Sequence, residues 1–449
     1  MKKIGFVSLG CPKNLVDSEV MMGKLAHAGY EITSDASEAE TLVVNTCGFI
    51  ASAKQESVDA ILEAARLKAE GSCQRLIVAG CLVERYRDEL RAELPEVDAF
   101  IGTNQLDEIT SVCDERTNTR QLPVIPIGNK TATYLYDETS PRLRATPRYS
   151  AFVKIAEGCD RPCAFCAIPL MRGSFRSRRF GSVVNEVHQL AQGGVKEIIL
   201  VAQDSSRYGE DLGQRNGLAH LLRELARIDE LEWVRVMYTY PTHISDEFLD
   251  VVASEPKAVK YLDMPLQHAA RSVLKSMRRG GTRESLEKLI ERVRRRVPEI
   301  AIRTTFITGF PGETEEDFGE LLAFVRIAEF DRVGVFTYSD EEEVAAYELG
   351  GKVDETIAMR RRNRLMKEQA RISLRRNRRF VGRTVRVLFE GESEETDLLW
   401  QGRMETQAPE VDGCVLINDA PENTNLKPGD FVNVLITEAQ EHDLIGRIV

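Results

Sequence analysis

Short apolar runs alternate with helical patterns of hydrophobic and polar residues over about the first 120 positions of the chain. The apolar runs lie in KKIGFVSLG, TLVVNTCGFI, QRLIVAGCLV and VDAFIGT. Strands that alternate with helices are typical of a parallel sheet with crossover connections. The pattern therefore predicts an α/β domain with a parallel sheet over residues 1–120.

A cysteine follows each of three of these runs. Cys11 comes after FVSLG, Cys47 after LVVNT and Cys81 after LIVAG. The carboxyl ends of parallel strands share one edge of a sheet, where α/β proteins bind ligands. The three thiols could therefore meet in one crevice, although any one of them alone would be a common kind of buried, inert residue.

The middle of the chain repeats a strand-then-helix pattern six times. It follows a segment rich in proline and polar residues, 121–146, which is typical of a linker. The six strand candidates are YSAFVKIA, EIILVAQ, WVRVMYTY, YLDMPLQ, AIRTTFITG and RVGVFTYS. Because a closed barrel of this kind needs eight units, we predict a partial, open TIM-like (βα)6 barrel over residues 147–358.

Two further segments complete the chain. Residues 359–379 carry ten Lys or Arg against one acid, Glu368, which predicts a basic connecting helix that faces either solvent or RNA. From 380 to 449 only strand and turn patterns occur. Short strands with polar turns predict a small all-β barrel related to the OB type.

Composition limits the class of protein. The chain has 449 residues, enough for about three domains, and its 43% hydrophobic and 29% charged residues are typical of a soluble globular protein. Its first apolar run is too short for a secretory signal, and no stretch reaches the length of a membrane span. We therefore expect a cytoplasmic protein without a membrane partner. Its nine cysteines are then more often ligands, catalysts or core residues than disulfides.

The segment GCDRPCAFC places Cys159, Cys163 and Cys166 close together, with no fourth cysteine or histidine nearby. Structural zinc sites use four protein ligands. A cubane cluster also needs four ligands, one for each iron, so three cysteines leave one iron open. The C-x3-C-x2-C spacing after the first strand of a partial barrel resembles the radical S-adenosylmethionine superfamily.

That resemblance implies a 4Fe-4S cluster on Cys159, Cys163 and Cys166, with S-adenosylmethionine on the open iron as the source of a 5'-deoxyadenosyl radical. The stretch TTFITGFPGETEEDF is similar to the superfamily's adenine-binding strand, with Ile307 and Gly309 at the matching positions. The superfamily's Gly-Gly-Glu is not seen, and VAQDSS stands in its place, so Gln203 and Asp204 are the candidates for the methionine part. No catalytic residue is assigned.

Beside the radical motif, the three strand-end cysteines favour a second cluster. The whole chain resembles the methylthiotransferases, which have an N-terminal cluster domain, a radical domain and a terminal TRAM domain. The resemblance implies a second 4Fe-4S cluster on Cys11, Cys47 and Cys81 whose open iron holds sulfide or persulfide sulfur. One S-adenosylmethionine would methylate this sulfur, and the radical from another would activate the carbon that receives the methylthio group. An electron donor such as flavodoxin or ferredoxin is implied.

Two branches of this family differ in substrate. SLGCPKNLVDSE, NTCGFIASAKQES, YLDMPLQH and YSDEEEVAAY look like the RimO-like branch, which modifies the β carbon of an aspartate in small-subunit ribosomal protein twelve. The MiaB-like branch modifies an adenosine in tRNA, and its first motif runs closer to GCQMN. Residues 380–449 have a net charge of −9, out of −11 for the chain, which repels tRNA and attracts a basic ribosomal protein.

The expected function is therefore methylthiolation of the ribosomal protein, free or in the ribosome. A MiaB-like tRNA enzyme is one alternative, and a non-catalytic iron-sulfur protein that docks on the ribosome is another. Such carriers seldom leave coordination positions open, whereas this chain is expected to leave two.

Overall fold

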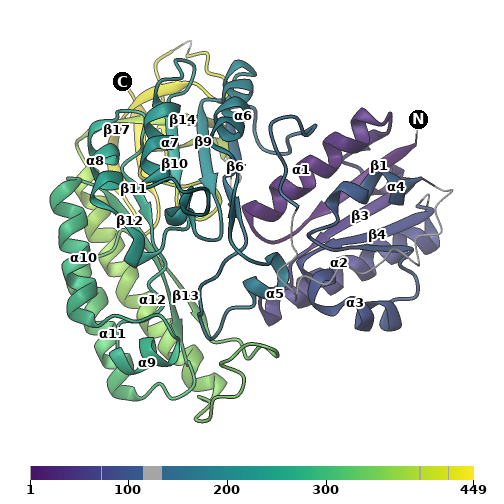
Figure 1. Cartoon of the computed structure of the whole chain (residues 1–449). Helices are drawn as coiled ribbons and strands as arrows, with labels where there is room; N and C mark the ends of the chain where they lie inside the picture. The colour runs from purple at the N-terminus through teal and green to yellow at the C-terminus, as the bar shows by residue number, and fades with distance from the viewer. Residues whose placement is uncertain (1, 72, 115–133, 394–395, 423) are drawn as a thin grey trace.

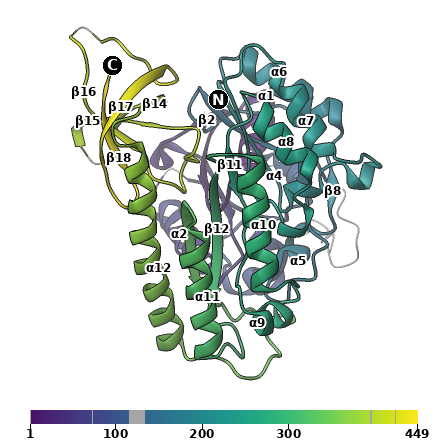
Figure 2. The same ribbon diagram turned by 90° about the vertical axis from the view of Figure 1, so that its left-hand side faces the viewer.

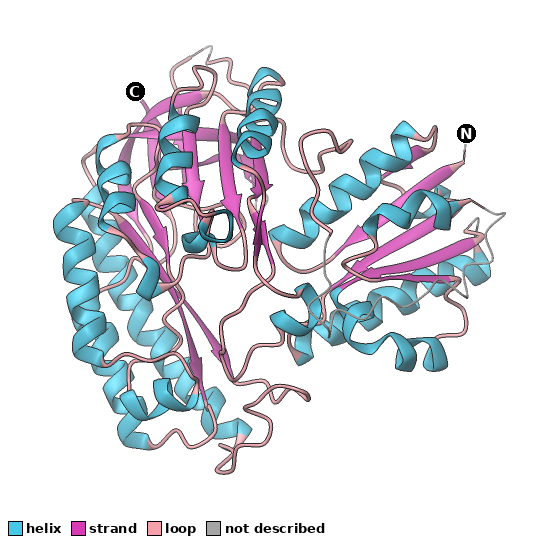
Figure 3. Cartoon of the chain, in the orientation of Figure 1, coloured by secondary structure: helices cyan, strands magenta, loops and turns pink. Residues whose placement is uncertain are grey.

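The computed structural model describes residues 2–71, 73–114, 134–393, 396–422 and 424–449. Figure 1 shows an N-terminal α/β domain beside a larger central barrel, with a small β-barrel packed on one end of the central barrel. Figure 3 shows that helices cover the sheets of the first two bodies, whereas the small barrel is built of strands.

Five parallel strands form the sheet of the N-terminal domain. Its elements are β1 Lys3–Ser8, α1 Pro12–His27, β2 Glu31–Thr33, β3 Thr41–Thr46, α2 Ala51–Glu70, β4 Arg75–Gly80, α3 Cys81–Glu93, β5 Ala99–Ile101 and α4 Ile109–Cys113. The strand order is β2-β1-β3-β4-β5. Helices α2 and α3 pack on one face of the sheet, and α1 and α4 pack on the other. Strand β3 is buried along its whole length because helices cover both faces.

Six parallel strands and their connecting helices form the central barrel. Its elements are β6 Ser150–Lys154, β7 Ala156–Glu157, α5 Ile168–Arg172, β8 Arg176–Ser177, α6 Phe180–Gln192, β9 Glu197–Val201, α7 Gly217–Ala226, β10 Trp233–Val236, α8 Asp246–Ser254, β11 Tyr261–Asp263, α9 Arg271–Ser276, α10 Arg283–Arg296, β12 Ala301–Thr308, α11 Glu315–Ala328 and β13 Arg332–Thr337. Strands β6, β9 and β10 pair in one half and β11, β12 and β13 in the other, and a bridge between Val234 and Ala258 joins the halves. Among the described strands, β6 and β13 do not pair with each other, so the barrel is open between them.

The N-terminal domain lies along this open side. Helix α1 packs on β6 through Val16, which shares a hydrophobic cluster with Phe152. At the other edge, Glu341 follows β13 and accepts hydrogen bonds from Lys54 at 2.7 Å and Arg85 at 3.0 Å. The N-terminal domain thus contacts both free edges of the barrel, β6 and the segment after β13, and covers the open side between them.

A long helix, α12, leads from the central barrel to the small one. It spans Glu355–Asn377, and Figure 2 shows it running beside α11 up to the small barrel. Leu365 and Ile372 are buried on one face, and Arg361 is paired with Glu313 of the central barrel. The predicted basic helix therefore also covers the central barrel, and part of its charge is neutralised within the chain.

The C-terminal residues form a closed barrel of five strands. These are β14 Thr384–Ser393, β15 Thr396–Arg403, β16 Val415–Asp419, β17 Phe431–Ala439 and β18 Leu444–Ile448, in the order β14-β15-β16-β18-β17. The predicted fold class is confirmed in all three parts: a parallel α/β domain, a partial (βα)6 barrel and a small all-β barrel.

The small barrel packs on the amino ends of the central strands. Arg403 forms a buried ion pair of 2.6 Å with Glu197, the first residue of β9. Trp233, the first residue of β10, packs edge-on against Phe431 with ring centroids 4.9 Å apart. The carboxyl ends of the central strands therefore face away from the small barrel.

The predicted linker is only partly described. Residues 121–133 lie outside the described residues, and 134–146 contain neither helix nor strand. This second part is nevertheless packed, because Arg142 is buried between Glu19 of α1 and Glu186 of α6. Within the described part of the chain, no helix is both long and apolar enough to cross a membrane.

Candidate cluster sites

The three N-terminal cysteines come together at the carboxyl ends of their strands. Cys11 is the N-cap of α1, Cys47 follows β3 directly, and Cys81 begins α3. Gly10 has a φ of +89°, and a Cβ there would lie 2.8 Å from the Cβ of Cys47. Only glycine lets the loop before Cys11 approach Cys47 this closely.

The three thiols act on one another's ionisation. Burial raises the pKa of Cys81 to about 12, and the charges of Cys11 and Cys47 act on it in the same direction. Burial also raises the pKa of Cys47. Burial alone would raise the pKa of Cys11, but the charges of Lys13 and Arg172 and two backbone amides of α1 together lower it. Such a set of thiols, of which Cys81 is buried and Cys11 and Cys47 are half-buried, has the chemistry of a soft-metal or cluster site.

The second set of cysteines lies in the loop after β7. The backbone N–H of Cys159 donates to the carbonyl of Gly173 at 3.0 Å, and that of Cys166 donates to the carbonyl of Cys163 at 3.2 Å. Burial raises the pKa of Cys159 to about 11 and that of Cys166 to about 12. The guanidinium of Arg279 lies 3.5 Å from the Sγ of Cys163.

The two cysteine sets face each other at one end of the central barrel. Cys81 shares a hydrophobic cluster with Ala164 and Ala167, which lie between and beside the cysteines of the second set. Phe49 and Phe165 pack against the same cluster, one from each domain. The predicted metal-binding residues are therefore brought together as two sets across a domain boundary.

Arg172 joins the domains next to Cys81. Its Nε donates to the Sγ of Cys81 at 3.3 Å, and its Nη2 donates to Asn14 Oδ1 at 3.1 Å. Asp17 and Glu157 accept from the same guanidinium, so two carboxylates fix its orientation. Burial would raise the pKa of Glu157, but Lys154 and Arg172 hold it well below its usual range.

The residues predicted to bind the methionine part of S-adenosylmethionine lie after β9. Gln203 donates to Glu157 at 2.5 Å, while its buried Oε1 has no hydrogen-bond partner within the described structure. Asp204 accepts from Arg161 at 2.8 Å. Gln203 therefore presents a free acceptor near the second cysteine set, whereas both oxygens of Asp204 are already engaged, one by Arg161 and the other by Ser206.

The predicted adenine-binding residues lie on and after β12. Ile307 lines a cavity of about 180 Å³ together with Phe49, Phe165 and Gln267. Gly309 has a φ of +77°, and a Cβ there would lie 2.3 Å from Ala358 Cβ. The close packing of α12 thus accounts for this glycine, and ligand contact at Gly309 stays a prediction.

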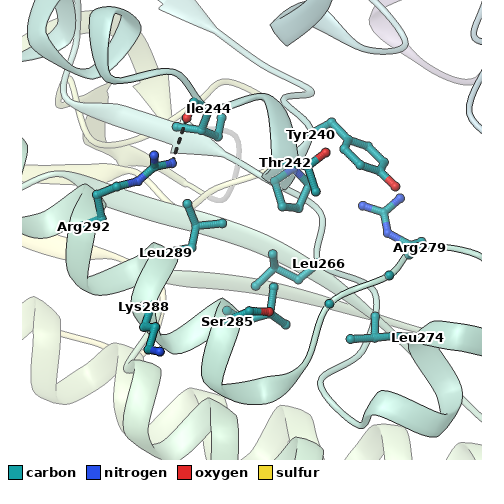
Figure 4. Close-up of a pocket in the computed structure, with 14 residues that line it drawn as sticks. Tyr240, Thr242, Ile244, Leu266, Leu274, Arg279, Ser285, Lys288, Leu289 and Arg292 are labelled. Carbon is teal, nitrogen blue, oxygen red and sulfur yellow. Dashed lines mark hydrogen bonds between the residues drawn. The ribbon is translucent and has the colours of Figure 1, made fainter.

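A larger pocket of about 370 Å³ opens beside the second cysteine set. Figure 4 shows Tyr240 and Arg279 on one side of this pocket and Lys288 and Arg292 on the other. The guanidinium carbon of Arg279 lies 4.4 Å from the centroid of the Tyr240 ring, and that of Arg161 lies 4.1 Å from the same centroid. Arg279 therefore connects this pocket to Cys163.

Sequence reasoning missed Arg172, Arg279 and Lys13. Arg172 follows the cysteine motif within a few residues, which is a weak local signal. The contact of Arg279 joins positions 116 residues apart, so no local pattern could indicate it. Lys13 stands two positions after Cys11, but its surroundings depend on the packing of α1 against the barrel.

The remaining cysteines do not join either set. Cys73 and Cys113 are buried in the two hydrophobic cores of the N-terminal domain, and Cys414 precedes β16. Across the described ranges, no three His, Cys, Asp or Glu side chains enclose a position for a single metal ion. The ligands of a cubane cluster bind separate irons, so both cysteine sets suit a cluster by their chemistry.

Comparison with known families agrees with this architecture. Residues 3–102 match the model of the uncharacterized protein family UPF0004, residues 153–325 match the radical SAM superfamily, and residues 381–449 match the TRAM domain. Among solved structures, the methyltransferase TsrM from Kitasatospora setae has a TM-score of 0.55 at 16% identity, over 75% of this chain and 73% of that one. The fold and the cysteine motif define a radical S-adenosylmethionine enzyme.

Curated relatives match over the whole length. "Ribosomal protein uS12 methylthiotransferase RimO" from Solibacter usitatus is 54% identical over 100% of this chain and 95% of the relative. The protein of the same name from Geobacter sulfurreducens is 48% identical over 100% of this chain and 99% of the relative. The chain belongs to the RimO family of methylthiotransferases.

Proposed function

We propose that this protein is a methylthiotransferase that adds a methylthio group to the β carbon of an aspartate in ribosomal protein uS12, the small-subunit protein twelve. The observation that carries the proposal is the meeting of two three-cysteine sets at the carboxyl end of one barrel. One set suits radical formation and the other suits sulfur delivery. Full-length similarity to proteins named uS12 methylthiotransferases supports this substrate.

The cysteine sets divide the work between two domains. Cys159, Cys163 and Cys166 hold one 4Fe-4S cluster in the radical domain, 147–358, and Cys11, Cys47 and Cys81 hold the other in the N-terminal domain, 1–120. The linker 121–146, the connecting helix 359–379 and the TRAM barrel 380–449 complete the chain. When bound, the clusters and two molecules of S-adenosylmethionine supply a 5'-deoxyadenosyl radical and a methylated sulfide or persulfide sulfur.

The protein's own residues bind and shield these groups. Gln203 and Asp204 contact the methionine part of S-adenosylmethionine, and Ile307 and Gly309 contact its adenine. The free Oε1 of Gln203 supports the first assignment, because a buried acceptor without a partner favours a ligand that donates to it.

Aromatic side chains close the site against water. Phe165 packs edge-on against Phe310 with ring centroids 6.5 Å apart, and Phe49 of the N-terminal domain lines the same region. A dry site protects a reactive radical from side reactions. Electrons come from a donor such as flavodoxin or ferredoxin, and the enzyme works in the cytoplasm.

The charge of the TRAM barrel supports a protein substrate over tRNA. Five Lys or Arg against fourteen Asp or Glu leave residues 380–449 strongly negative. Ribosomal proteins are generally basic, so this surface attracts one and speeds the encounter, whereas it repels a polyanion.

Intact mass tests the proposal. Ribosomal protein uS12 and the modified nucleosides of tRNA are analysed from cells with and without this gene. We expect the methylthio increment to disappear from uS12 and the tRNA to stay unchanged. Loss of the methylthio group from tRNA alone would assign the protein to the tRNA-modifying branch. A lack of 5'-deoxyadenosine after anaerobic reconstitution with dithionite would leave only the non-catalytic alternative.

A further inference from the structure

Lys13 is a largely buried lysine whose ammonium lies over an aromatic ring. The residue is 7% exposed, and Nζ lies 3.2 Å from the centroid of the Tyr238 ring. Within the described residues, Nζ has neither a hydrogen-bond acceptor nor a carboxylate at ion-pair distance. The three donors of the ammonium are therefore available, and the Tyr238 ring is the group that Nζ contacts within the described residues.

Tyr238 and Cys11 are the acidic groups that act most on the charge of Lys13, followed by Asp263. The Asp263 carboxylate is already engaged, because Arg303 donates to one of its oxygens at 2.9 Å and the Tyr238 backbone N–H to the other at 3.0 Å. Arg172 adds a second positive charge nearby. The proposed role of Cys11 as an iron ligand and the engagement of Asp263 leave the hydrogen-bond donors of Lys13 available to a further anion.

Lys13 lies at the mouth of the barrel. Lys13 lies in the first turn of α1, two residues after Cys11, and Tyr238 lies two residues beyond the carboxyl end of β10. The ammonium therefore sits between the N-terminal cysteine set and the rim of the barrel. The amino end of α1 adds partial positive charge at the same point.

We propose that Lys13 binds the side-chain carboxylate of the aspartate that is modified. This inference rests on the proposed function and names the residue that recognises the reacting side chain. The β carbon of aspartate is bonded directly to its carboxylate carbon, about 1.5 Å away. An ammonium that holds the carboxylate next to Cys11 therefore holds the β carbon next to the site of sulfur delivery.

The same arrangement selects aspartate over asparagine. A buried ammonium gains a charge-assisted hydrogen bond from a carboxylate, whereas a neutral amide leaves the ammonium without a counter-charge. The methionine carboxylate of S-adenosylmethionine is the other carboxylate available at this end of the barrel. The test must therefore separate these two sources.

A double-mutant cycle between enzyme and substrate tests the proposal. Reconstituted full-length enzyme without reductant is titrated with unmodified uS12 and with uS12 whose target aspartate is changed to asparagine. We expect the wild type to bind the aspartate form about 30-fold more tightly. Lys13→Met should lower affinity for the aspartate form to that of the asparagine form, and Lys13→Arg should keep part of the preference. Lys24→Met, on the same helix but paired with Asp107, is the matched control.

Three results would overturn the assignment. Equal weakening of both uS12 forms by Lys13→Met, or a loss of iron in that variant, would give Lys13 a structural or cluster-supporting role. Weaker binding of S-adenosylmethionine with unchanged uS12 binding would assign the carboxylate to S-adenosylmethionine. If the wild type bound neither form of uS12 while Lys13→Met retained its iron, the proposed function itself would fail, and the assignment with it.

Discussion

The Nε of Arg172 donates a hydrogen bond to the Sγ of Cys81, 3.3 Å away and on the other side of a domain boundary. Arg172 belongs to the radical domain and Cys81 to the N-terminal domain, so the N-terminal cysteine set is completed by a residue that its own domain lacks. Asp17 and Glu157 hold the guanidinium in place.

Replacing Arg172 should weaken the N-terminal cluster selectively. Arg172→Gln removes the donor to Cys81 and leaves Asp17 and Glu157 with Lys154 as their remaining buried cation. We expect iron after reconstitution to fall from about eight toward about four atoms per chain, while 5'-deoxyadenosine formation persists. Iron analysis and product assay check this. Arg223→Gln, which breaks an exposed pair with Glu247, is the control, and full iron in Arg172→Gln would contradict the prediction.

Alanine substitutions in the two cysteine sets should abolish different reactions. Alanine at Cys159, Cys163 or Cys166 should abolish 5'-deoxyadenosine formation, because it removes a ligand of the radical-forming cluster. Alanine at Cys11, Cys47 or Cys81 should leave this cleavage intact and stop methylthiolation. Anaerobic assays of both products distinguish the outcomes, with Cys73→Ala as a control cysteine outside both sets. Methylthiolated uS12 from a Cys47→Ala enzyme would refute the role of the second set.

Charge reversal on the TRAM barrel should weaken substrate binding. Glu392, Asp419 and Glu422 are exposed on this barrel, while the neighbouring acids Glu394 and Glu395 lie outside the described residues. Lysine at the three described positions should lower affinity for uS12 and reduce its dependence on salt. Titrations at two ionic strengths measure both effects.

Three exposed acids of α2 provide the control for this charge change. Lysine at Asp59, Glu63 and Glu70 alters the net charge of the chain equally but leaves the TRAM barrel intact. Equal loss of affinity in both triple variants would mean that overall charge, and not the TRAM barrel, attracts the substrate.

The docking of the TRAM barrel should be sensitive to acid. Burial would raise the pKa of Glu197, but Arg403 and Arg235 lower it to about 2, below its usual value of 4.5. The resulting stability is complete above pH 4.5 and is lost as pH falls toward 2. We expect a loss of about 2 kcal/mol in unfolding free energy between pH 7 and pH 3 from this group.

Urea unfolding at several pH values measures this effect. Glu197→Gln should be less stable than the wild type at pH 7, because Arg403 and Arg235 lose their buried counter-charge, and its stability should change less between pH 7 and pH 3. An identical pH dependence in the variant and the wild type would show that other carboxylates control the acid transition.

Local pattern predicts the strands and the cysteines at their carboxyl ends. Cys11, Cys47 and Cys81 follow apolar runs in the sequence, and the structure places them at the carboxyl ends of parallel strands. The number of strand-helix units also predicts that the central barrel is open.

Contacts between distant segments could not be predicted in this way. Glu341 meets Lys54 and Arg85 across more than 250 positions, and these pairs determine how the N-terminal domain covers the open side. The burial of Lys13 and the contact of Arg172 with Cys81 depend on the same docking. The spacing of apolar residues along the sequence does not predict such pairs. It indicates which face of a helix or strand is buried, but not which other element covers that face.

The TRAM barrel packs at the amino ends of the central strands, whereas both cysteine sets lie at the carboxyl ends. Strand β12 alone, with eight residues, separates these ends by about 26 Å. On the proposed function, a substrate that is attracted by the acidic barrel and modified at the mouth is held at two distant points. A partner long enough to reach both points gains affinity from both contacts at once. A short peptide that carries the same aspartate gains affinity from only one contact.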